Sequence, residues 1–329
     1  MEPIARSFLA ACLVAFCPFA LAQGTAWKPE RNVEIVVGVG PGGGIDRTAR
    51  TLQRILQEQR LLPVTAAVVN RPGGGGTIAQ AYLNQHAGDA HFFEITATSL
   101  LTNHITGRSA HSHKEYTPIA MLYDEYLGFL VKEDSPLRTG ADLLAALKAD
   151  PESLPIGIAT AAGNTNHIAA GLAARAAGAD ARKLKVVVFG SGGESTRALL
   201  GGHVALVVTP SANAIPHLKA SRMRVLAVAA PARLEGALSA VPTWKEQGAD
   251  IVVANWRPVI GPRGLTPAQV AFWEDVFARV TATDDWKSEI GRSGGVNHYM
   301  SSRELAAYFD AQYAVFKSVL GDLGLAKNR

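Results

Sequence analysis

Glycines and small polar side chains recur at four places in the 329-residue chain, each directly after a short apolar run. Glycine lets a ligand approach the backbone closely, and free N–H groups at the start of a helix bind anions. One such segment is a tight turn more often than a site, but four in one chain favour a ligand held by backbone, hydroxyl and amide donors. The segments are GPGGGID (40–46), TATSLLTN (96–103), TAAGNTNH (160–167) and FGSGGES (189–195).

The first segment overlaps a dinucleotide-binding pattern. Residues 38–43, GVGPGG, satisfy G-x-G-x-x-G directly after an apolar run. A dinucleotide fold places an acidic residue at the end of its second strand to hold the ribose, whereas this chain has Asn70 and Arg71 there. Arg71 leaves an NADP-dependent enzyme open as an alternative. No Lys-Ser or Lys-Thr pair follows the glycines, as a phosphate loop requires. We therefore predict no cofactor.

Nucleophilic and metal chemistry find little support in the sequence. The pattern G-x-S-x-G is absent, and neither Ser191 nor Ser195 has an assignable base. His111 and His113 form the best metal-like pair, but no third ligand lies near them in the sequence. We predict no metal site and no catalytic residues. The sequence therefore favours a binding protein, with a secreted hydrolytic or NADP-dependent enzyme as the alternative.

The charge of the chain is mild for its length. It has 32 Lys and Arg against 28 Asp and Glu, which gives a formal net charge of +4. No run of five or more basic residues is present, and few aromatic residues lie among the basic ones, so nucleic acid is not an expected partner. A small anionic ligand fits this charge.

The N-terminus has the pattern of a secretory signal peptide. Arg6 precedes an apolar stretch, Phe8–Ala22, which ends on the small-x-small sequence Ala20-Leu21-Ala22. We assign residues 1–22 to the signal peptide and predict a periplasmic protein. The stretch is too short for a convincing membrane span, and no later segment is long and apolar enough for one.

The two cysteines of the chain both lie in this leader. Leu9–Cys12 also has the form of a lipoprotein cleavage box, which would leave a very short leader and a lipid anchor at Cys12. Cys17 is the other cysteine, so cleavage after Ala22 leaves no thiol in the mature chain. Disulfides and thiolate metal sites are then excluded from the exported protein.

The rest of the chain alternates strand and helix patterns. This order is typical of an α/β fold with largely parallel sheets, in which ligands bind beyond the carboxyl ends of the strands. The expected strands are 33–37, 64–69, 92–97, 127–131, 156–159, 184–189, 206–208 and 225–229. The expected helices are 46–59, 77–85, 140–147, 168–177 and 195–200, and the chain from residue 267 onward is mostly helical.

Eight segments in sequence order carry a resemblance over almost the whole mature chain. They are PGGGIDRTAR, VVNRPGGGGTIAQAYLNQHAGD, LLTNHITG, EDSPLRTGADLL, LLGGHVALVV, VLAVAAPARL, VPTWKEQGAD and NWRPVIGPRGLTP. Together they resemble the Bug family of periplasmic solute-binding proteins, and more closely the TctC-like receptors of tripartite tricarboxylate transporters.

The resemblance implies a type II periplasmic binding protein fold, with two lobes and a ligand cleft between them. It places lobe 1 at 23–124 and 255–329 and lobe 2 at 125–254, with crossings near 122–126 and 254–256. It implies a ligand carboxylate held between the glycine loops of the two lobes. By position, the implied ligand-binding residues are Gly42, Gly43, Gly44, Asp46, Thr98 and Ser99 on lobe 1, and Gly163, Asn164, Asn166, His167, Gly190, Ser191, Thr209 and Ser211 on lobe 2.

The chain also departs from the family pattern. Family members often have Pro-Phe-Pro-Pro before the glycines, where this chain has Gly38–Pro41, so an aromatic wall is missing and ligand size cannot be transferred. Arg257 follows the second crossing, where a guanidinium could hold a further carboxylate or form a hinge or surface ion pair.

The expected function is therefore that of an exported receptor that closes its lobes around a small carboxylated metabolite, with di- and tricarboxylates as the candidate ligands. The implied partners are the membrane permease subunits of a tripartite transporter, and the receptor itself is expected to be a monomer. An orphan ligand sensor with the same site is a further alternative.

Overall fold

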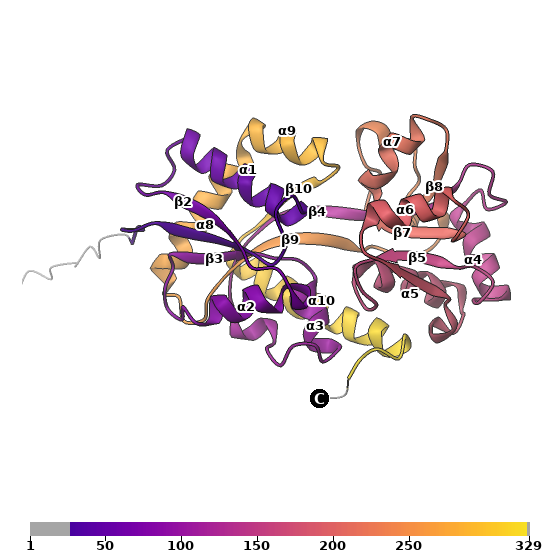
Figure 1. Cartoon of the computed structure of the whole chain (residues 1–329), viewed down its shortest axis with the longest axis horizontal. Helices are drawn as coiled ribbons and strands as arrows, with labels where there is room; N and C mark the ends of the chain where they lie inside the picture. The colour runs from indigo at the N-terminus through magenta and orange to yellow at the C-terminus, as the bar shows by residue number, and fades with distance from the viewer. Residues whose placement is uncertain (1–26, 328–329) are drawn as a thin grey trace, which may run out of the picture.

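The computed structural model describes residues 27–327, which fold into two lobes that lie side by side (Figure 1). The predicted signal peptide and the possible lipid attachment at Cys12 lie outside the described residues. Within the described part of the chain, no helix is long and apolar enough to cross a membrane.

Lobe 1 is built on the strands β1 (Val33–Val37), β2 (Ala66–Asn70) and β3 (Phe92–Ile95), in the order β2-β1-β3 and mutually parallel. Val33, Ile35, Val36 and Val37 are fully buried, which explains why every residue of β1 except Glu34 is β-branched and apolar. The helices of this lobe are α1 (Gly44–Glu58), α2 (Thr77–Asn84), α3 (Ser99–Ile105), α8 (Pro267–Ala282) and α9 (Asp284–Arg292).

Lobe 2 repeats the plan with β5 (Ile156–Ala159) between β6 (Val186–Phe189) and β7 (Leu206–Pro210), again parallel. The strand β8 (Met223–Val228) joins the sheet through β4. The helices are α4 (Gly140–Ala149), α5 (Thr165–Ala177), α6 (Gly192–Leu200) and the single turn α7 (Ile215–Leu218). In both lobes, the loops that follow the parallel strands lead into helices.

Two long strands connect the lobes. β4 (Thr117–Lys132) pairs with β9 (Ala254–Gly261) over Thr117–Tyr126 and with β7 and β8 beyond Leu127. The chain leaves lobe 1 along β4 and returns along β9, so these two strands must be antiparallel. The sheets are therefore mixed, with parallel outer strands and an antiparallel centre, rather than largely parallel throughout. The boundaries expected at 124/125 and 254/255 fall inside β4 and at the first residue of β9.

Strand β9 is absent from the expected elements because Arg257 and Pro258 interrupt its apolar pattern. Proline removes a ladder hydrogen bond and is tolerated in a sheet interior at irregularities. Pro258 stands opposite Met121, next to a shift in the register between β4 and β9. Asp124 and Glu125 interrupt the pattern of β4 in the same way, which explains why only its second half, 127–131, was expected.

The C-terminal helix α10 (Ser302–Asp322) contacts both lobes. Near its middle, Tyr313 hydrogen-bonds His104 of lobe 1 at 2.8 Å. Near its end, Val319 packs so closely on Gly171 of α5 that a Cβ on this glycine would lie 3.0 Å from it. Asp322 accepts a hydrogen bond from Arg175 of α5 at 2.8 Å. Helix α10 therefore contacts both lobes, and the bounds implied by the resemblance include it in lobe 1.

Candidate functional site

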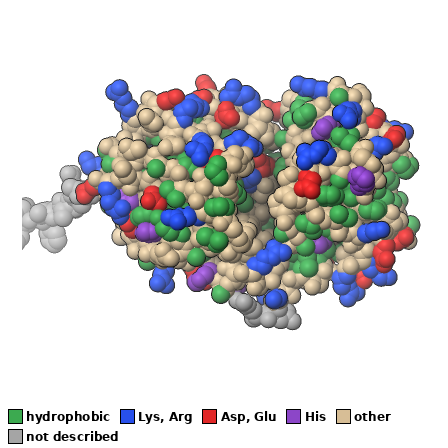
Figure 2. Space-filling model, in the orientation of Figure 1, with side chains coloured by type: hydrophobic (Ala, Val, Ile, Leu, Met, Phe, Trp, Pro, Cys, Tyr) green, Lys and Arg blue, Asp and Glu red, His purple; other side chains and the backbone are tan. Residues whose placement is uncertain are grey.

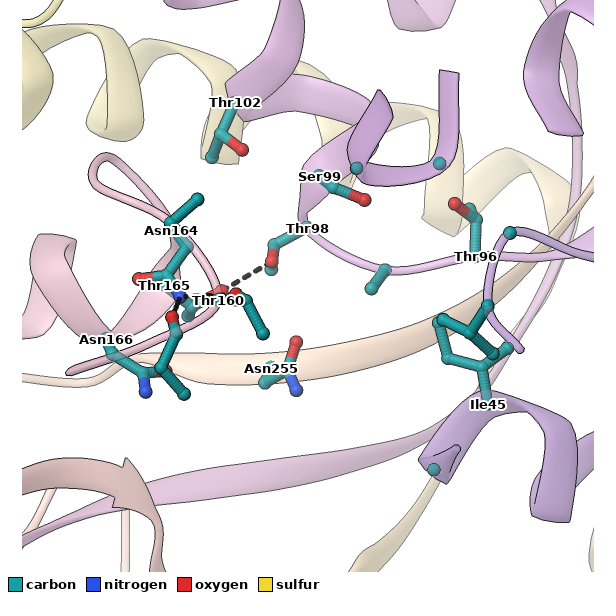
Figure 3. Close-up of a pocket in the computed structure, with 18 of the residues that line it drawn as sticks. Ile45, Thr96, Thr98, Ser99, Thr102, Thr160, Asn164, Thr165, Asn166 and Asn255 are labelled. Carbon is teal, nitrogen blue, oxygen red and sulfur yellow. Dashed lines mark hydrogen bonds between the residues drawn. The ribbon is translucent and has the colours of Figure 1, made fainter. Parts of the chain in front are cut away.

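A cleft of about 700 Å³ lies between the lobes, and residues of both lobes line it. Figure 2 shows the hollow between the two halves of the molecule. In Figure 3, Ile45 and Thr96 lie on one side, Thr160 and Asn164 on the other, and Asn255 of β9 lies between them. Most lining side chains are small, hydroxyl-bearing or amides, and none of the described aromatic residues belongs to the lining.

Three helices of nine residues or more begin at this cleft. Gly44 starts α1 in lobe 1, whereas Thr165 starts α5 and Gly192 starts α6 in lobe 2. The first N–H groups of a helix have no partner within it, and they carry the positive end of its dipole. Among the described residues, no atom accepts a hydrogen bond from the N–H groups of Gly44, Thr165 or Gly192. The cleft therefore offers donors for an anion from both lobes.

The glycine loop of lobe 1 is held by the buried carboxylate of Asp46, which is 1% exposed. Asp46 accepts hydrogen bonds from the Gly42 N–H at 2.8 Å, from the Asn70 amide at 2.8 Å and from two nitrogens of Arg50 at 2.9 and 3.0 Å. Burial alone would raise the pKa of Asp46, but these hydrogen bonds lower it to about 2. Asp46 is thus a permanently charged support of residues 42–44 and lies behind the cleft wall.

The corresponding loop of lobe 2 contains strained backbone. Thr160 lines the cleft with φ = 67°, a conformation that is rare for a β-branched residue. Its N–H donates to Phe189 at 2.7 Å, and its hydroxyl accepts from the Asn164 amide at 3.1 Å. Asn164 also caps α5, because its side-chain oxygen Oδ1 accepts a hydrogen bond from the His167 N–H at 3.1 Å. Such strain persists only where the surroundings hold it, and it concentrates at binding sites.

Two hydrogen bonds join the lobes across the cleft. The hydroxyls of Thr98 in lobe 1 and Thr165 in lobe 2 are bonded to each other, as the dashed line in Figure 3 shows, and both residues are nine-tenths or more buried. Arg108 of lobe 1 donates from Nη2 to the Ala162 carbonyl of lobe 2 at 2.7 Å. The structure therefore holds the lobes in direct contact around the cleft.

Arg257 lies on the cleft wall but is engaged by its own protein. Its Nη2 donates to Glu125 at 2.6 Å, and its Nη1 donates to the carbonyls of Asn255 and Trp256 at 3.1 and 3.3 Å. Its Nε has no partner among the described residues. Because Glu125 belongs to β4 and Arg257 to β9, this partly buried ion pair ties together the two strands that connect the lobes.

The residues implied by the resemblance divide into two groups. On the cleft wall lie Gly44, Thr98, Ser99, Asn164, Asn166, Thr209 and Arg257. Outside the lining lie Gly42, Gly43, Asp46, Gly163, His167, Gly190, Ser191 and Ser211.

Several residues of the second group support the wall. Ser191 caps α6 by accepting from the Glu194 N–H at 3.2 Å, and the Gly190 N–H donates to the Glu194 carboxylate at 2.9 Å. The His167 ring accepts from the Gly163 N–H at 3.0 Å. Burial lowers the pKa of His167 to about 4, so this ring is neutral at physiological pH. His167 is thus placed to order the loop rather than to carry charge.

The sequence reasoning missed several lining residues, and some of them had a recognisable signal. The segment NRPGGGG is not among the four predicted ligand-binding segments, yet its Gly74, Gly75 and Gly76 line the cleft with φ values of 59°, 67° and 101°. Asn255, another lining residue, is the second residue of β9, directly at the expected second crossing between the lobes. Other lining residues, above all Glu94, had no signal, because they lie inside an apolar strand pattern.

The two histidines of the metal-like pair have separate partners. His111 binds Glu115 at 2.6 Å, and His113 binds Asp310 of α10 at 3.0 Å. Among the described residues, no group of three or more His, Cys, Asp or Glu could hold a metal ion.

Comparison with known proteins agrees with this geometry. Residues 48–325 match the family described as "Tripartite tricarboxylate transporter family receptor". The UPF0065 protein in the gbd 5' region of Cupriavidus necator is 28% identical over 327 residues, which cover 98% of each chain. BugT of Bordetella pertussis is 28% identical over 244 residues, which cover 73% of each chain.

Solved structures show the same fold. A TctC solute-binding protein from Polaromonas, solved without ligand, superposes with a TM-score of 0.78 at 26% identity, over 90% of this chain and 99% of that chain. The structure titled "R. palustris Rpa4515 with adipate" superposes with a TM-score of 0.76 at 25% identity, over 91% and 99%. These neighbours confirm the expected two-lobed periplasmic binding protein fold. With the family match over most of the sequence, they show that the chain belongs to the tripartite tricarboxylate transporter receptor family, the TctC-like solute-binding proteins of the Bug group.

Proposed function

We propose that this protein is a periplasmic receptor that captures a small aliphatic carboxylate between its lobes and delivers it to the membrane permease subunits of a tripartite transporter. The observation that carries the proposal is the meeting of the α1, α5 and α6 N-termini at one cleft. Helix N-termini with free N–H groups favour anions. The described residues that line the cleft include no aromatic side chain, which favours an aliphatic ligand over an aromatic one.

The proposed site residues are cleft-lining donors of both lobes. A ligand carboxylate would accept from the Gly44 N–H of lobe 1 and from the Thr165 and Gly192 N–H groups of lobe 2. The hydroxyl and amide groups of Ser99, Asn164 and Asn255 would hold the rest of the ligand. A solved relative of similar fold is described with bound adipate, which supports a carboxylate of this kind. The cleft volume of about 700 Å³ lies within the usual range for small-molecule sites.

The mechanism is closure of the lobes about β4 and β9. A ligand that contacts both lobes binds the closed form more tightly than the open form, and so it shifts the population toward the closed form. The permease would then recognise the closed, loaded receptor. The receptor itself works as a monomer.

Binding of ligand by a thermal-shift screen, followed by calorimetry, tests this function. The screen contains aliphatic mono-, di- and tricarboxylates, aromatic acids, acidic amino acids, NADPH and ATP. Ligand at about 100 times its dissociation constant stabilises a protein by roughly 2.7 kcal/mol, which is a readily measured shift. We expect the shift with aliphatic carboxylates. Tight binding of NADPH or ATP without any carboxylate response would contradict the receptor function.

A matched pair of glycine variants tests the site. A Cβ at Gly44 would meet no described atom closer than 3.8 Å, so Gly44→Val is expected to fold while its side chain fills the cleft beside the free N–H groups. Gly40→Ala is the control, because Gly40 lies outside the lining and its Cβ would meet nothing within 4 Å. We expect Gly44→Val to lose carboxylate binding and Gly40→Ala to retain it. If Gly44→Val binds carboxylates as tightly as Gly40→Ala and the unmodified protein do, this end of α1 is excluded from the site.

The hydrogen bond between Thr98 and Thr165 gives a prediction about closure. Thr165→Val keeps the shape of the side chain and removes a bond that only the closed form makes, so ligand affinity should fall about three- to tenfold. Thr48→Val is the control, since it breaks a buried bond of 2.7 Å to Tyr123 within lobe 1. It should lower the melting temperature without changing affinity. At one pH, titration calorimetry measures the affinities and scanning calorimetry measures the melting temperatures of the two variants. An unchanged affinity in Thr165→Val would show that this bond plays no part in closure.

A further inference from the structure

Glu94 is a buried acidic residue on the wall of the cleft. It lies on β3, opposite Val36 of β1 and Ile260 of β9, and is 1% exposed. Its Oε2 is buried and has no partner among the described residues. A buried polar atom without a partner costs free energy, and such an atom beside a cleft is explained when a ligand completes its hydrogen bonding.

The charged and titratable groups around Glu94 do not neutralise it. On β1 the titratable residue is Glu34, which accepts from Tyr82 of α2 at 2.8 Å. Arg257 on β9 is paired with Glu125. Tyr116 lies before β4, and the charge of Glu94 helps to raise the pKa of its hydroxyl. Tyr116 therefore supplies no positive charge to Glu94. His86, after α2, stacks on Phe92 at the other end of the strand.

The carboxyl is therefore neutral at physiological pH. Burial raises the pKa of Glu94 to about 8, although a hydrogen bond from Thr96 opposes the shift. A neutral carboxyl has one O–H donor, and its complement is an acceptor oxygen.

Further donors of lobe 1 lie beside Gly76, which lines the same cleft as Glu94. A Cβ at Gly76 would lie 3.6 Å from the Ser99 hydroxyl and 3.8 Å from Nε2 of Gln80. Gln80 is 2% exposed, and its Nε2 has no partner among the described residues. Gly76, with φ = 101°, thus leaves a space bordered by two donors, one of them unused.

We propose that Glu94 donates a hydrogen bond to a carboxylate oxygen at the second end of the ligand, and that the receptor thereby selects dicarboxylates over monocarboxylates and ω-amino acids. The inference rests on the proposed function, because it assumes that the first carboxylate is held by the helix N-termini. It assigns the second carboxylate to the Glu94 end of lobe 1, where the donors lack partners, rather than to Arg257, whose Nη groups are engaged.

The test uses three ligands of matched length: a dicarboxylate, a monocarboxylate and an ω-amino acid. Adipate, hexanoate and 6-aminohexanoate form one such set. Sets with chains of C4 to C8 are screened first, and the set whose dicarboxylate binds most tightly is used. Calorimetry is performed from pH 6 to pH 10 on the purified protein and on Glu94→Gln and Glu94→Leu. Glutamine keeps a donor at the same place, and leucine fills the same volume without one.

We expect the unmodified protein to prefer the dicarboxylate, and its affinity to fall by up to tenfold for each pH unit above the pKa of Glu94, about 8. Glu94→Gln should bind the dicarboxylate within about threefold of the unmodified protein at pH 7, and without this pH dependence. Glu94→Leu should lose tenfold or more for the dicarboxylate and little for the monocarboxylate.

The unliganded protein gives an independent readout. The pKa of Glu94 is about 4.5 in the unfolded chain and about 8 in the folded protein, so the unfolded chain releases this proton at a lower pH. The free energy of unfolding should therefore fall as the pH rises from 4.5 to 8, whereas Glu94→Gln should show no such fall. Tighter binding of the ω-amino acid, abolished in Glu94→Gln, would show an ionised Glu94 acting as a counter-ion and would overturn the proposal. So would unchanged dicarboxylate affinity in Glu94→Leu. If the unmodified protein binds no carboxylate at all, the proposed function fails instead.

Discussion

Replacement of Asp46 by alanine is expected to abolish ligand binding and to lower the free energy of unfolding by about 2–3 kcal/mol, although Asp46 lies outside the cleft lining. The reason is that one carboxylate holds the Gly42 N–H, the Asn70 amide and Arg50 together. Without it, residues 42–44 lose their anchor, and the Gly44 N–H is no longer fixed in the cleft. The magnitude follows from the depressed pKa of Asp46, about 2, at about 1.4 kcal/mol for each pH unit.

The same carboxylate predicts the response to acid. A carboxyl with a depressed pKa stabilises the folded state above its unfolded pKa of about 3.8, and this contribution is lost as the pH falls through 2. The unmodified protein and Asp46→Ala should therefore differ in stability at pH 7 and converge near pH 2. Chemical denaturation at several pH values measures this difference.

Asp180→Ala is the control for Asp46→Ala. The pKa of Asp180 is also lowered to about 2, by hydrogen bonds from Arg182, but Asp180 lies before β6 and outside the cleft lining. This variant should bind carboxylates normally. Retention of binding by Asp46→Ala, measured by calorimetry, would mean that the glycine loop needs no support from the aspartate.

Replacement of Arg257 by alanine is expected to cost up to about 3 kcal/mol of stability, because Glu125, whose side chain is 15% exposed, loses its charged partner and keeps only the hydrogen bond from the Asn255 amide at 3.1 Å. Since the pair ties β4 to β9, the loss should also weaken closure. Affinities for mono- and dicarboxylates should therefore fall by the same factor. Denaturant titration and calorimetry with matched ligands measure the two effects.

The double variant Arg257→Met with Glu125→Gln is the matched control, because it removes both charges and fills a similar volume. It should recover most of the lost stability. A selective loss of the dicarboxylate in Arg257→Ala would instead assign the second carboxylate to Arg257. That result would also contradict its assignment to Glu94.

Local patterns predicted the outer strands of both lobes accurately. The expected strands 33–37 and 156–159 coincide with β1 and β5, because both strands are largely buried on two faces and, apart from Glu34, consist of apolar residues and glycine. The helix starts at 44, 165 and 192 were each expected within three residues, because glycine, asparagine and serine mark such starts. Residue type thus determined where helix N-termini and their donors occur along the chain.

The sequence could not decide which residues of these loops face the ligand. Gly42, Gly43 and Gly44 are chemically identical, yet only Gly44 of the three lies on the wall, since the direction of each N–H depends on where the turn ends and the helix begins. The side chain of Asp46, two residues further on, turns away and supports the loop from behind. Such differences arise from backbone direction, which composition does not encode.

The sequence by itself determined the α/β class, the positions of the glycine loops and the family. Tertiary structure alone decided the chemistry of the cleft. Glu94 is one acidic residue in an apolar strand, and its neutral state follows from burial between β1, β9 and α2. Arg257 and Glu125 lie 132 residues apart and meet because β4 and β9 run antiparallel between the lobes. Charge state and pairing depend on neighbours that are distant in sequence, and folding is what brings those neighbours together.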